Sequence, residues 1–299
     1  MNWYSHNTGI FSFIGGGRDN GILANSYAGV ASGRQNLVNA SRYSFVGGGY
    51  KNDIILTKES FIGGGFSNLI NSPNDVKCDN VLGGGCMNQI TDSSLSVLGG
   101  GYNNVINGRN NAFIGGGGNN NVNAGYSSVV GGQGNIVNNG FSAIGGGVNN
   151  LVSGDYSMIG SGRDNQVVPG GGITPFNSFI GSGRYNVINS GYSFIGSGNG
   201  NAASGASSSI VGGNNNIVSG AFSAVLGGSG NNDGGFQYVG IFGQNVNGVM
   251  ANAFHVEELV IQNVPVVTSI GAWTFLAPGQ VYTTTTPGTN YLASPLYVK

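Results

Sequence analysis

The chain contains the stretch Ser178-Phe179-Ile180-Gly181-Ser182-Gly183-Arg184-Tyr185-Asn186. Nearly the same residues occur at positions 12–20, where they read Ser-Phe-Ile-Gly-Gly-Gly-Arg-Asp-Asn, and again at positions 44–52. Each copy has an apolar pair, a glycine-rich run and an asparagine in the same order. An internal repeat of this kind is interpreted first, because it governs the architecture of the whole chain.

Fifteen copies of the repeat can be aligned on the residue that follows the apolar pair. Of the 14 intervals between these residues, eight are 16 residues long, four are 14 or 15, and the other two are 20 and 21. A short and nearly constant period predicts a solenoid with one turn per repeat. The aligned residues are Gly15, Ala31, Gly47, Gly63, Gly83, Gly99, Gly115, Gly131, Gly145, Gly160, Gly181, Gly196, Gly212, Gly227 and Gly243.

Each repeat carries two short strand signals separated by turns. One is the apolar pair, as in Phe179-Ile180, and the other follows the asparagine, as in Val187-Ile188. Glycine supplies the positive φ angles that the turns need. We therefore predict an all-β fold, a parallel β-solenoid (β-roll) of about 15 coils with a period near 16 residues and no helix. Coils that pair at about 4.8 Å would form a rod of roughly 70 Å.

The longer intervals and the chain ends predict additional segments. Residues 72–78 and 169–175 contain prolines and are expected to be loops inserted between coils. We expect a lead-in at residues 1–11, the β-roll at 12–252, and a small C-terminal β cap at 253–299 for trimerisation or docking. The last segment has no glycine triplet and is rich in aromatic residues. A solenoid needs such a cap to protect its last open edge.

Composition excludes several other classes of protein. The chain has 59 glycines in 299 residues and only 7 % charged residues, whereas an ordinary domain has about 7 % Gly and about 25 % charged residues. There is no Gly-X-Y triplet pattern of collagen, and 39 % hydrophobic residues argue against disorder. The net charge of −1 and the absence of a basic stripe disfavour nucleic acid as a partner. No long apolar run predicts a membrane span, and the N-terminus does not read as a signal peptide.

The apolar pair predicts an oligomer. Both residues of the pair are apolar in nearly every copy, and neighbouring residues on a strand point to opposite faces. One face can fill the coil, and the other needs a cover, which we expect to be further copies of the chain. The residue before the pair is Ser in ten of 15 copies. We expect this small residue to allow close contact of three subunits in a closed homotrimer.

An asparagine recurs four or five residues after the aligned position. Members of this column include Asn20, Asn36, Asn52, Asn135 and Asn232. Asparagine tolerates the left-handed conformation, bonds to turn backbone and can form stacked amide ladders. We therefore interpret the column as structural and not as a ligand site.

The stretch Asn177-Ser178-Phe179-Ile180-Gly181-Ser182-Gly183 resembles the head repeat of YadA-like trimeric adhesins. The resemblance covers about residues 12–247 and implies a left-handed parallel β-roll, a homotrimer and a surface-binding role. The chain departs from the adhesin pattern because it shows no secretion signal, heptad stalk or membrane-anchor strands. Similar repeats occur in bacteriophage and viral fibre proteins, which need none of these parts.

Patterns for catalysis, cofactors and metals are absent from the sequence. The glycine runs lack the Gly-Lys-Ser/Thr of a P-loop and the nine-residue period of calcium-binding repeats. His6 and His255 are the only histidines, Glu257 and Glu258 are adjacent on an expected strand, and Cys78 and Cys86 are either bridged or free. We expect no enzyme activity, no catalytic residue, no cofactor and no metal site, and no receptor-binding residue can be named.

The resulting hypothesis is a structural fibre or spike protein at the virion surface, from a phage head or tail fibre. We expect it to contact other capsid or tail proteins and to contribute to host attachment, where Tyr and Asn on exposed turns could bind a host-surface glycan or protein. The alternatives are a bacterial cell-surface trimeric adhesin or extracellular filament subunit, and an enzyme-bearing tailspike. The missing carboxylate cluster opposes the last of these.

Overall fold

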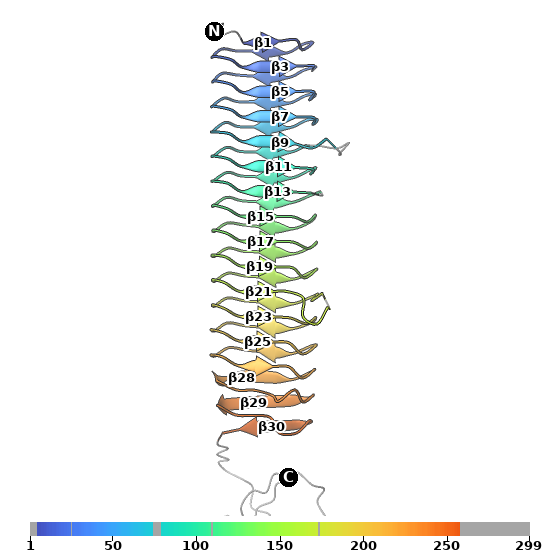
Figure 1. The fold of residues 1–299 in the computed structure, drawn as a ribbon, viewed down its shortest axis with the longest axis vertical. Helices are drawn as coiled ribbons and strands as arrows, with labels where there is room; N and C mark the ends of the chain where they lie inside the picture. Colours follow the sequence, from blue (N-terminus) through green and yellow to red (C-terminus); the bar gives the residue numbers. More distant parts are fainter. Residues whose placement is uncertain (1–4, 25, 74–78, 109, 173, 258–299) are drawn as a thin grey trace, which may run out of the picture. The chain divides into compact units, whose positions relative to one another are not determined.

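The computed structural model describes residues 5–257 apart from residues 25, 74–78, 109 and 173. Residues 5–257 belong to one compact unit, which is built as a rod of stacked coils (Figure 1). The described part of the chain contains only strands and turns, and no helix. The predicted β-solenoid of about 15 coils, with a period near 16 residues, is therefore confirmed.

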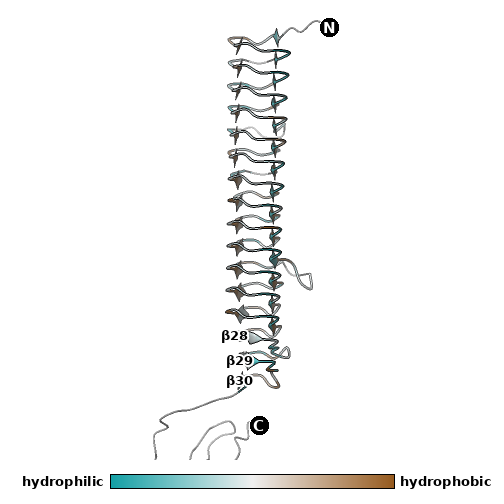
Figure 2. Ribbon diagram, turned by 90° about the vertical axis from the view of Figure 1, so that its left-hand side faces the viewer, coloured by the Kyte–Doolittle hydropathy of each residue, from teal (hydrophilic) through white to brown (hydrophobic). Residues whose placement is uncertain are grey.

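The strands form two parallel sheets that run the length of the rod, and Figure 2 shows them as two facing rows. Sheet 1 has 14 strands, and all but the first follow a ladder position occupied by asparagine. They are β1 (His6–Asn7), β3 (Gly21–Leu23), β5 (Leu37–Asn39), β7 (Asp53–Ile55), β9 (Leu69–Asn71), β11 (Gln89–Thr91), β13 (Val105–Asn107), β15 (Asn121–Val122), β17 (Ile136–Val137), β19 (Leu151–Val152), β21 (Gln166–Val167), β23 (Val187–Ile188), β25 (Ala202–Ala203) and β27 (Ile217–Val218).

Sheet 2 has 16 strands, most of which are formed by the apolar pairs. They are β2 (Phe13–Ile14), β4 (Gly29–Val30), β6 (Phe45–Val46), β8 (Phe61–Ile62), β10 (Val81–Leu82), β12 (Val97–Leu98), β14 (Phe113–Ile114), β16 (Ser128–Val129), β18 (Ala143–Ile144), β20 (Met158–Ile159), β22 (Phe179–Ile180), β24 (Phe194–Ile195), β26 (Ser209–Ile210), β28 (Ala224–Ser229), β29 (Val239–Gln244) and β30 (Ala253–Val256).

Two turns complete each coil. The glycine turn leads from sheet 2 to sheet 1, as in residues 145–149 between β18 and β19. The turn that returns to sheet 2, as in residues 153–157 between β19 and β20, carries an aromatic residue in many coils, and we call it the aromatic turn. The predicted inserted loops both extend aromatic turns, since strand register jumps from Phe61 to Val81 and from Met158 to Phe179.

Two rows of aliphatic side chains fill the coil. One row comes from the second residue of each sheet 2 pair, such as Ile144, and the other comes from sheet 1, such as Val152. Side chains in both rows have no exposed surface in nearly every coil. The interior is thus only two side chains wide, and each coil depends on its neighbours above and below for burial.

The coil shortens by one residue partway along the rod and lengthens again near its C-terminal end. Successive sheet 2 strands are 16 residues apart up to the pairing of Val97 with Phe113, apart from the first insertion. From the pairing of Phe113 with Ser128 onward the step is 15, apart from the second insertion, until it returns to 16 between Ala224 and Gly240. The missing residue lies in the aromatic turn. Eight residues separate Ile106 from Ile114, whereas seven separate Val122 from Val129.

This change corrects the sequence alignment in four coils. Aligning the glycine runs placed Val130, Val211, Leu226 and Phe242 in the same column as the inner residues of other coils, but these side chains are 49–58 % exposed. The residues that fill the coil there are the preceding ones, Val129, Ile210, Val225 and Ile241, which have no exposed surface. The glycine runs start one residue later in these coils, so they are a poor guide to register.

Sheet 1 ends at a buried carboxylate. Asp233 takes the place of the inner aliphatic residue of sheet 1 and is only 1 % exposed. Its oxygens accept hydrogen bonds from the backbone N–H groups of Ser219 (2.9 Å), Gly220 (2.6 Å) and Gly235 (3.0 Å). In the preceding coil, the N–H of Ser204 instead bonds to the carbonyl of Val218. Asp233 therefore replaces the carbonyls that a further sheet 1 strand would supply.

We expect Asp233→Ala to lower the free energy of unfolding by about 2 kcal/mol, because a buried N–H left without an acceptor costs about 1–3 kcal/mol. The effect should be local, so amide hydrogen exchange of Ser219 and Gly220 should accelerate. Exchange in the coils around Gly115 should not change, since each coil contacts only its neighbours. Unchanged protection at Gly220 would show that Asp233 does not cap the sheet.

The C-terminal part of the expected cap lies outside the described residues. Only residues 253–257 of the segment 253–299 are described, and there β30 pairs in parallel with β29. At the other end of the rod, β1 pairs with β3 inside the expected lead-in at 1–11. Among the described residues, none forms a helix long and apolar enough to cross a membrane.

Candidate binding surfaces

An apolar stripe runs along the outer face of sheet 2. Each of its side chains is half-buried or exposed in the single chain, at 38–58 % where it is most open. One residue of the apolar pair thus lies inside and the other outside, as the alternation of a strand requires. The stripe is formed by Phe13, Phe45, Phe61, Val81, Val97, Phe113, Val130, Met158, Phe179, Phe194, Val211, Leu226 and Phe242.

Most coils contribute one large apolar side chain to the stripe, although it stands at one of two positions in the coil. Phe113 is followed two residues later by Gly115, and a Cβ built at Gly115 would contact the Phe113 ring at 3.4 Å. Where the first position is small, as at Ser128, the second is large, as at Val130. Residues two apart share a face, so the exchange keeps the outer surface apolar.

The serine column lies inside the coil and not between subunits. Ser142 is 2 % exposed, and its hydroxyl donates to the carbonyl of Gly140 or Gly154 and accepts from the N–H of Ser157. Equivalent bonds link successive serines along the rod. Seven of the ten serines in the predicted column are buried in the corner of the coil, so our expectation that these seven form the contact between three subunits is wrong. Ser12, Ser128 and Ser209 are half-buried, and the buried residues next to the last two are Ser127 and Ser208.

The asparagine column is a buried ladder, as predicted. Asn150 donates from Nδ2 to the carbonyls of Gly146 (3.1 Å) and Gly162 (2.9 Å), and its Oδ1 accepts from the backbone N–H of Asn165 (3.0 Å). The last member of the ladder is Asn231, with no exposed surface, and not Asn232. The left-handed residue is the one before each ladder member, such as Asn149 at φ 55°. The amide bonds therefore select asparagine here, and tolerance of positive φ does not.

Exposed aromatic rings form short stacks along the aromatic turns. Neighbouring rings lie 4.8–5.2 Å apart with planes within 4–11° of each other. The stacks are Phe11–Tyr27–Tyr43, Tyr126–Phe141–Tyr156 and Phe222–Tyr238. The sequence analysis did not identify these rows, although each ring directly precedes the serine column or its equivalent.

The stacked residues have an unfavourable backbone conformation. Tyr126, Phe141 and Tyr156 have φ of 53–56°, a region where bulky residues are strained. Strain of this kind costs about 1–3 kcal/mol per residue, and ring stacking contributes about 0.5–1.5 kcal/mol per pair. Gly or Asn would avoid the strain, and Asn does occupy the same place at Asn111 and Asn177. Local stability alone therefore does not account for aromatic residues at this corner.

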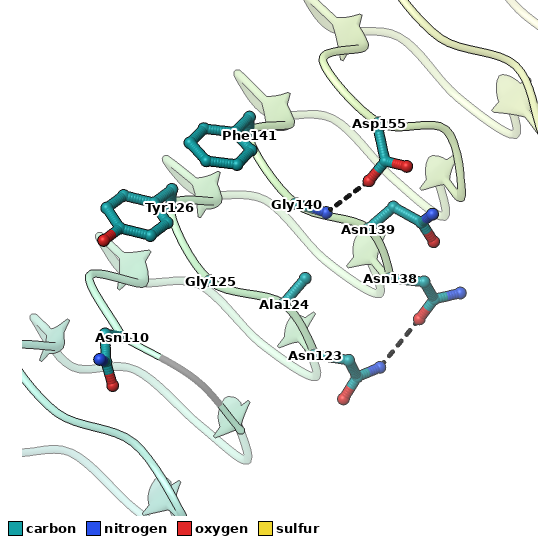
Figure 3. Close-up of a pocket in the computed structure, with 10 residues that line it drawn as sticks. All are labelled: Asn110, Asn123, Ala124, Gly125, Tyr126, Asn138, Asn139, Gly140, Phe141 and Asp155. Carbon is teal, nitrogen blue, oxygen red and sulfur yellow. Dashed lines mark hydrogen bonds between the residues drawn. The ribbon is translucent and has the colours of Figure 1, made fainter.

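A groove of about 640 Å³ lies beside the second stack (Figure 3). The backbone at Gly125 and Gly140 forms its floor, with the rings of Tyr126 and Phe141 on one side and the amides of Asn123 and Asn138 on the other. Asn110, Ala124, Asn139 and Asp155 complete the lining. The groove extends from Asn110, in the last of the longer aromatic turns, over the first two shortened turns.

A second groove, of about 460 Å³, lies on the outer face of sheet 1 near the N-terminus. It contains Asp53, whose carboxyl pKa is raised because burial disfavours the charged form; the Leu37 backbone and the Lys51 ammonium act in the opposite direction. Asp53 stands between Leu37 and Leu69 in the sheet, so its neighbours across the strands are aliphatic. No aromatic residue lines this groove.

The residues considered for chemistry from the sequence are not brought together. His6 is exposed at the N-terminal end, whereas His255 is half-buried in β30 near the carbonyl of Met250. Glu257 accepts a hydrogen bond from the N–H of Gln244, and Glu258 lies outside the described residues. Cys86 is a free thiol, and Cys78 is not described. Within residues 5–257, as far as they are described, no group of three or more His, Cys, Asp or Glu could hold a metal ion.

No protein-family model matches the chain, and no curated protein matches it. The functional interpretation therefore depends on the rod and its surfaces.

Proposed function

We propose that the chain is a structural fibre or spike protein at the surface of a virion, assembled as a homotrimer and contributing to host attachment. The single observation that carries this proposal is the apolar stripe, which follows the outer face of sheet 2 along the rod. A monomer rarely exposes a continuous apolar surface of this kind. Three copies related by a closed symmetry axis would cover it and leave no open lateral face.

A rod of stacked coils suits a fibre because its length grows with the number of repeats while its cross-section stays constant. The resemblance to YadA-like head repeats supports the trimer and the attachment role, and the fibre proteins of phages and viruses share such repeats. A cell-surface adhesin or an extracellular filament subunit would use the same rod and stripe. Imaging of particles labelled with an antibody against the chain separates these roles, because only a virion protein decorates the particles.

We expect light scattering of the full chain to give three times the mass of one chain. Phe113→Glu should dissociate the trimer, because it places a charge on the apolar stripe. Phe66→Glu is the matched control, since Phe66 is 43 % exposed against 39 % for Phe113 but lies on a glycine turn. A monomeric wild-type chain would contradict the trimer. Equal dissociation by both variants would contradict the placement of the subunit contact on the outer face of sheet 2.

A further inference from the structure

We propose that the groove beside Tyr126 and Phe141 binds a neutral oligosaccharide. This inference deepens the proposed attachment role and rests on it, since it names the class of host-surface ligand and the residues that contact it. Four features of the groove support the assignment: its origin in the change of coil length, an uncovered aromatic face, a row of amides, and the near absence of charge.

The groove exists because the coil shortens. The aromatic turn that begins at Asn123 is the first with one residue fewer, and the coil before it still has the longer turn, which ends at Asn111. Gly125 and Gly140 then form a floor without side chains between the rings and the amides (Figure 3). From Asn110 to Asp155 the groove spans three coil steps, or about 14 Å, which suits a short chain of sugar rings.

Tyr126 offers a free ring face at one end of the groove. Phe141 stacks on one side of the Tyr126 ring at 4.9 Å, and Tyr156 continues the stack beyond it. The corresponding residue in the preceding coil is Asn111, so no described aromatic ring covers the other side. Tyr126 is 57 % exposed. The C–H face of a pyranose packs well on such a ring, whose body is apolar and whose hydroxyl stays in water.

The amides supply the matching polar contacts. Asn123 donates to Oδ1 of Asn138 (2.9 Å), and Asn138 donates to Oγ of Ser153 (3.0 Å), so both side chains are held in place. The side chains of Asn110 and Asn139 form no hydrogen bond with other described residues and are available to a ligand. An amide both donates and accepts, as sugar hydroxyl groups do.

The charge of the groove favours an uncharged ligand. Asp155 is the only charged residue among the described residues of the lining, and one of its oxygens accepts the N–H of Gly140 at 3.1 Å. None of the lining residues that the structure describes is a Lys or Arg, so a sulfated, phosphorylated or sialylated ligand would find no counter-charge from them. A neutral oligosaccharide with hydroxyl and amide groups fits this set of residues best.

The test measures binding of the full chain to an immobilised panel of neutral and acidic oligosaccharides. We expect at least one neutral oligosaccharide to bind, and Tyr126→Asn and Asn138→Val each to weaken that binding by tenfold or more. Both substitutions use residues that the fold already accepts at equivalent places, namely Asn111 and Val168. Tyr43→Asn is the matched control, because Tyr43 is equally exposed (57 %) and stacked on Tyr27 but lines neither of the two grooves described above.

The outcomes separate this proposal from the fibre function. Loss of binding in both groove variants, with normal binding by Tyr43→Asn, would support the site. Binding of no neutral oligosaccharide by the wild-type chain, or binding that survives both substitutions, would overturn it. Antibody labelling of particles, and adsorption of those particles to cells, would still report on the fibre role, since neither depends on which surface of the rod binds sugar.

Discussion

Replacing Gly147 by alanine should lower the free energy of unfolding by about 4 kcal/mol or more, an effect reached only by severe steric or buried-polar defects. Gly147 has φ +95°, and a Cβ built there would overlap the carbonyl oxygen of Gly162 and lie 2.8 Å from Nδ2 of Asn150. The carbonyl belongs to the backbone of the next coil, so it cannot rotate away. Relief would require the two coils to separate, which breaks both sheets locally.

The neighbouring residue gives a matched control for this change. A Cβ at Gly146 would meet no atom within 4 Å, and its backbone is outside the left-handed region. Gly146→Ala should therefore be neutral or slightly stabilising, by up to about 1 kcal/mol, because alanine restricts the unfolded chain. Thermal unfolding followed by circular dichroism compares the two variants. Similar thermal midpoints for the Gly147→Ala and Gly146→Ala variants would show that the close approach of neighbouring coils does not restrict the side chain at residue 147.

The second large effect is expected at the asparagine ladder. Asn150→Ala would leave the carbonyls of Gly146 and Gly162 and the N–H of Asn165 without their side-chain partner in a site with no exposed surface. The carbonyl of Gly162 still accepts from the N–H of Val148, so two groups are left unpaired and one loses its second hydrogen bond. Each buried polar group left unpaired costs about 1–3 kcal/mol, so the total loss should be about 3–5 kcal/mol. Hydrogen exchange should accelerate most at Asn165 and in the coils directly above and below it.

Asn149 serves as the control for the ladder. It is exposed, has φ 55°, and is adjacent to Asn150 in the sequence. Asn149→Gly should be tolerated because glycine adopts this conformation readily and already occupies the equivalent position in the preceding coil, Gly134. We expect a change within about 1 kcal/mol. A loss as large as that of Asn150→Ala would mean that the turn, and not the buried amide, stabilises this corner.

The architecture could be predicted from the sequence because one period specifies it. Spacing near 16, two strand signals per repeat and glycine between them lead to stacked coils, and the strand pairs have the predicted parallel order. The alternation of the apolar pair also correctly predicted one inner and one outer row. The asparagine column was correctly predicted as a structural feature. Of the reasons given for it, the bonds to turn backbone and the stacking of amides hold, whereas tolerance of the left-handed conformation does not apply, since the preceding residue adopts it.

Register in four coils could not be read from the glycine runs, but another signal was present. The inner residue of sheet 2 always lies six residues before the ladder asparagine, as Val129 lies before Asn135 and Val225 before Asn231. The ladder asparagine keeps its register because its amide is buried and hydrogen-bonded. The large apolar side chain on the outer face, in contrast, can occupy either of two positions two residues apart. Aligning the repeats on the ladder asparagine would have assigned Val130 and Leu226 to the outer face of sheet 2.

The groove and the aromatic stacks were harder to predict. The groove depends on a turn that loses a single residue, and a change of spacing from 16 to 15 residues looks like ordinary variation in a degenerate repeat. The rings also occupy a left-handed position, where propensity favours Gly or Asn. Sequence reasoning expected the serines to meet other subunits because they are small, but their hydroxyl bonds bury them at a corner.

The change of coil length has a consequence for how identical rods could align with each other. In a uniform repeat, two parallel copies could slide by one coil and regain nearly the same contacts. Here a slipped copy would place a longer coil of one rod beside a shorter coil of its neighbour, and the small residues Gly29 and Ala143 would no longer face their own counterparts. In an assembly of parallel copies, these irregularities would therefore favour the alignment in which equivalent coils lie side by side.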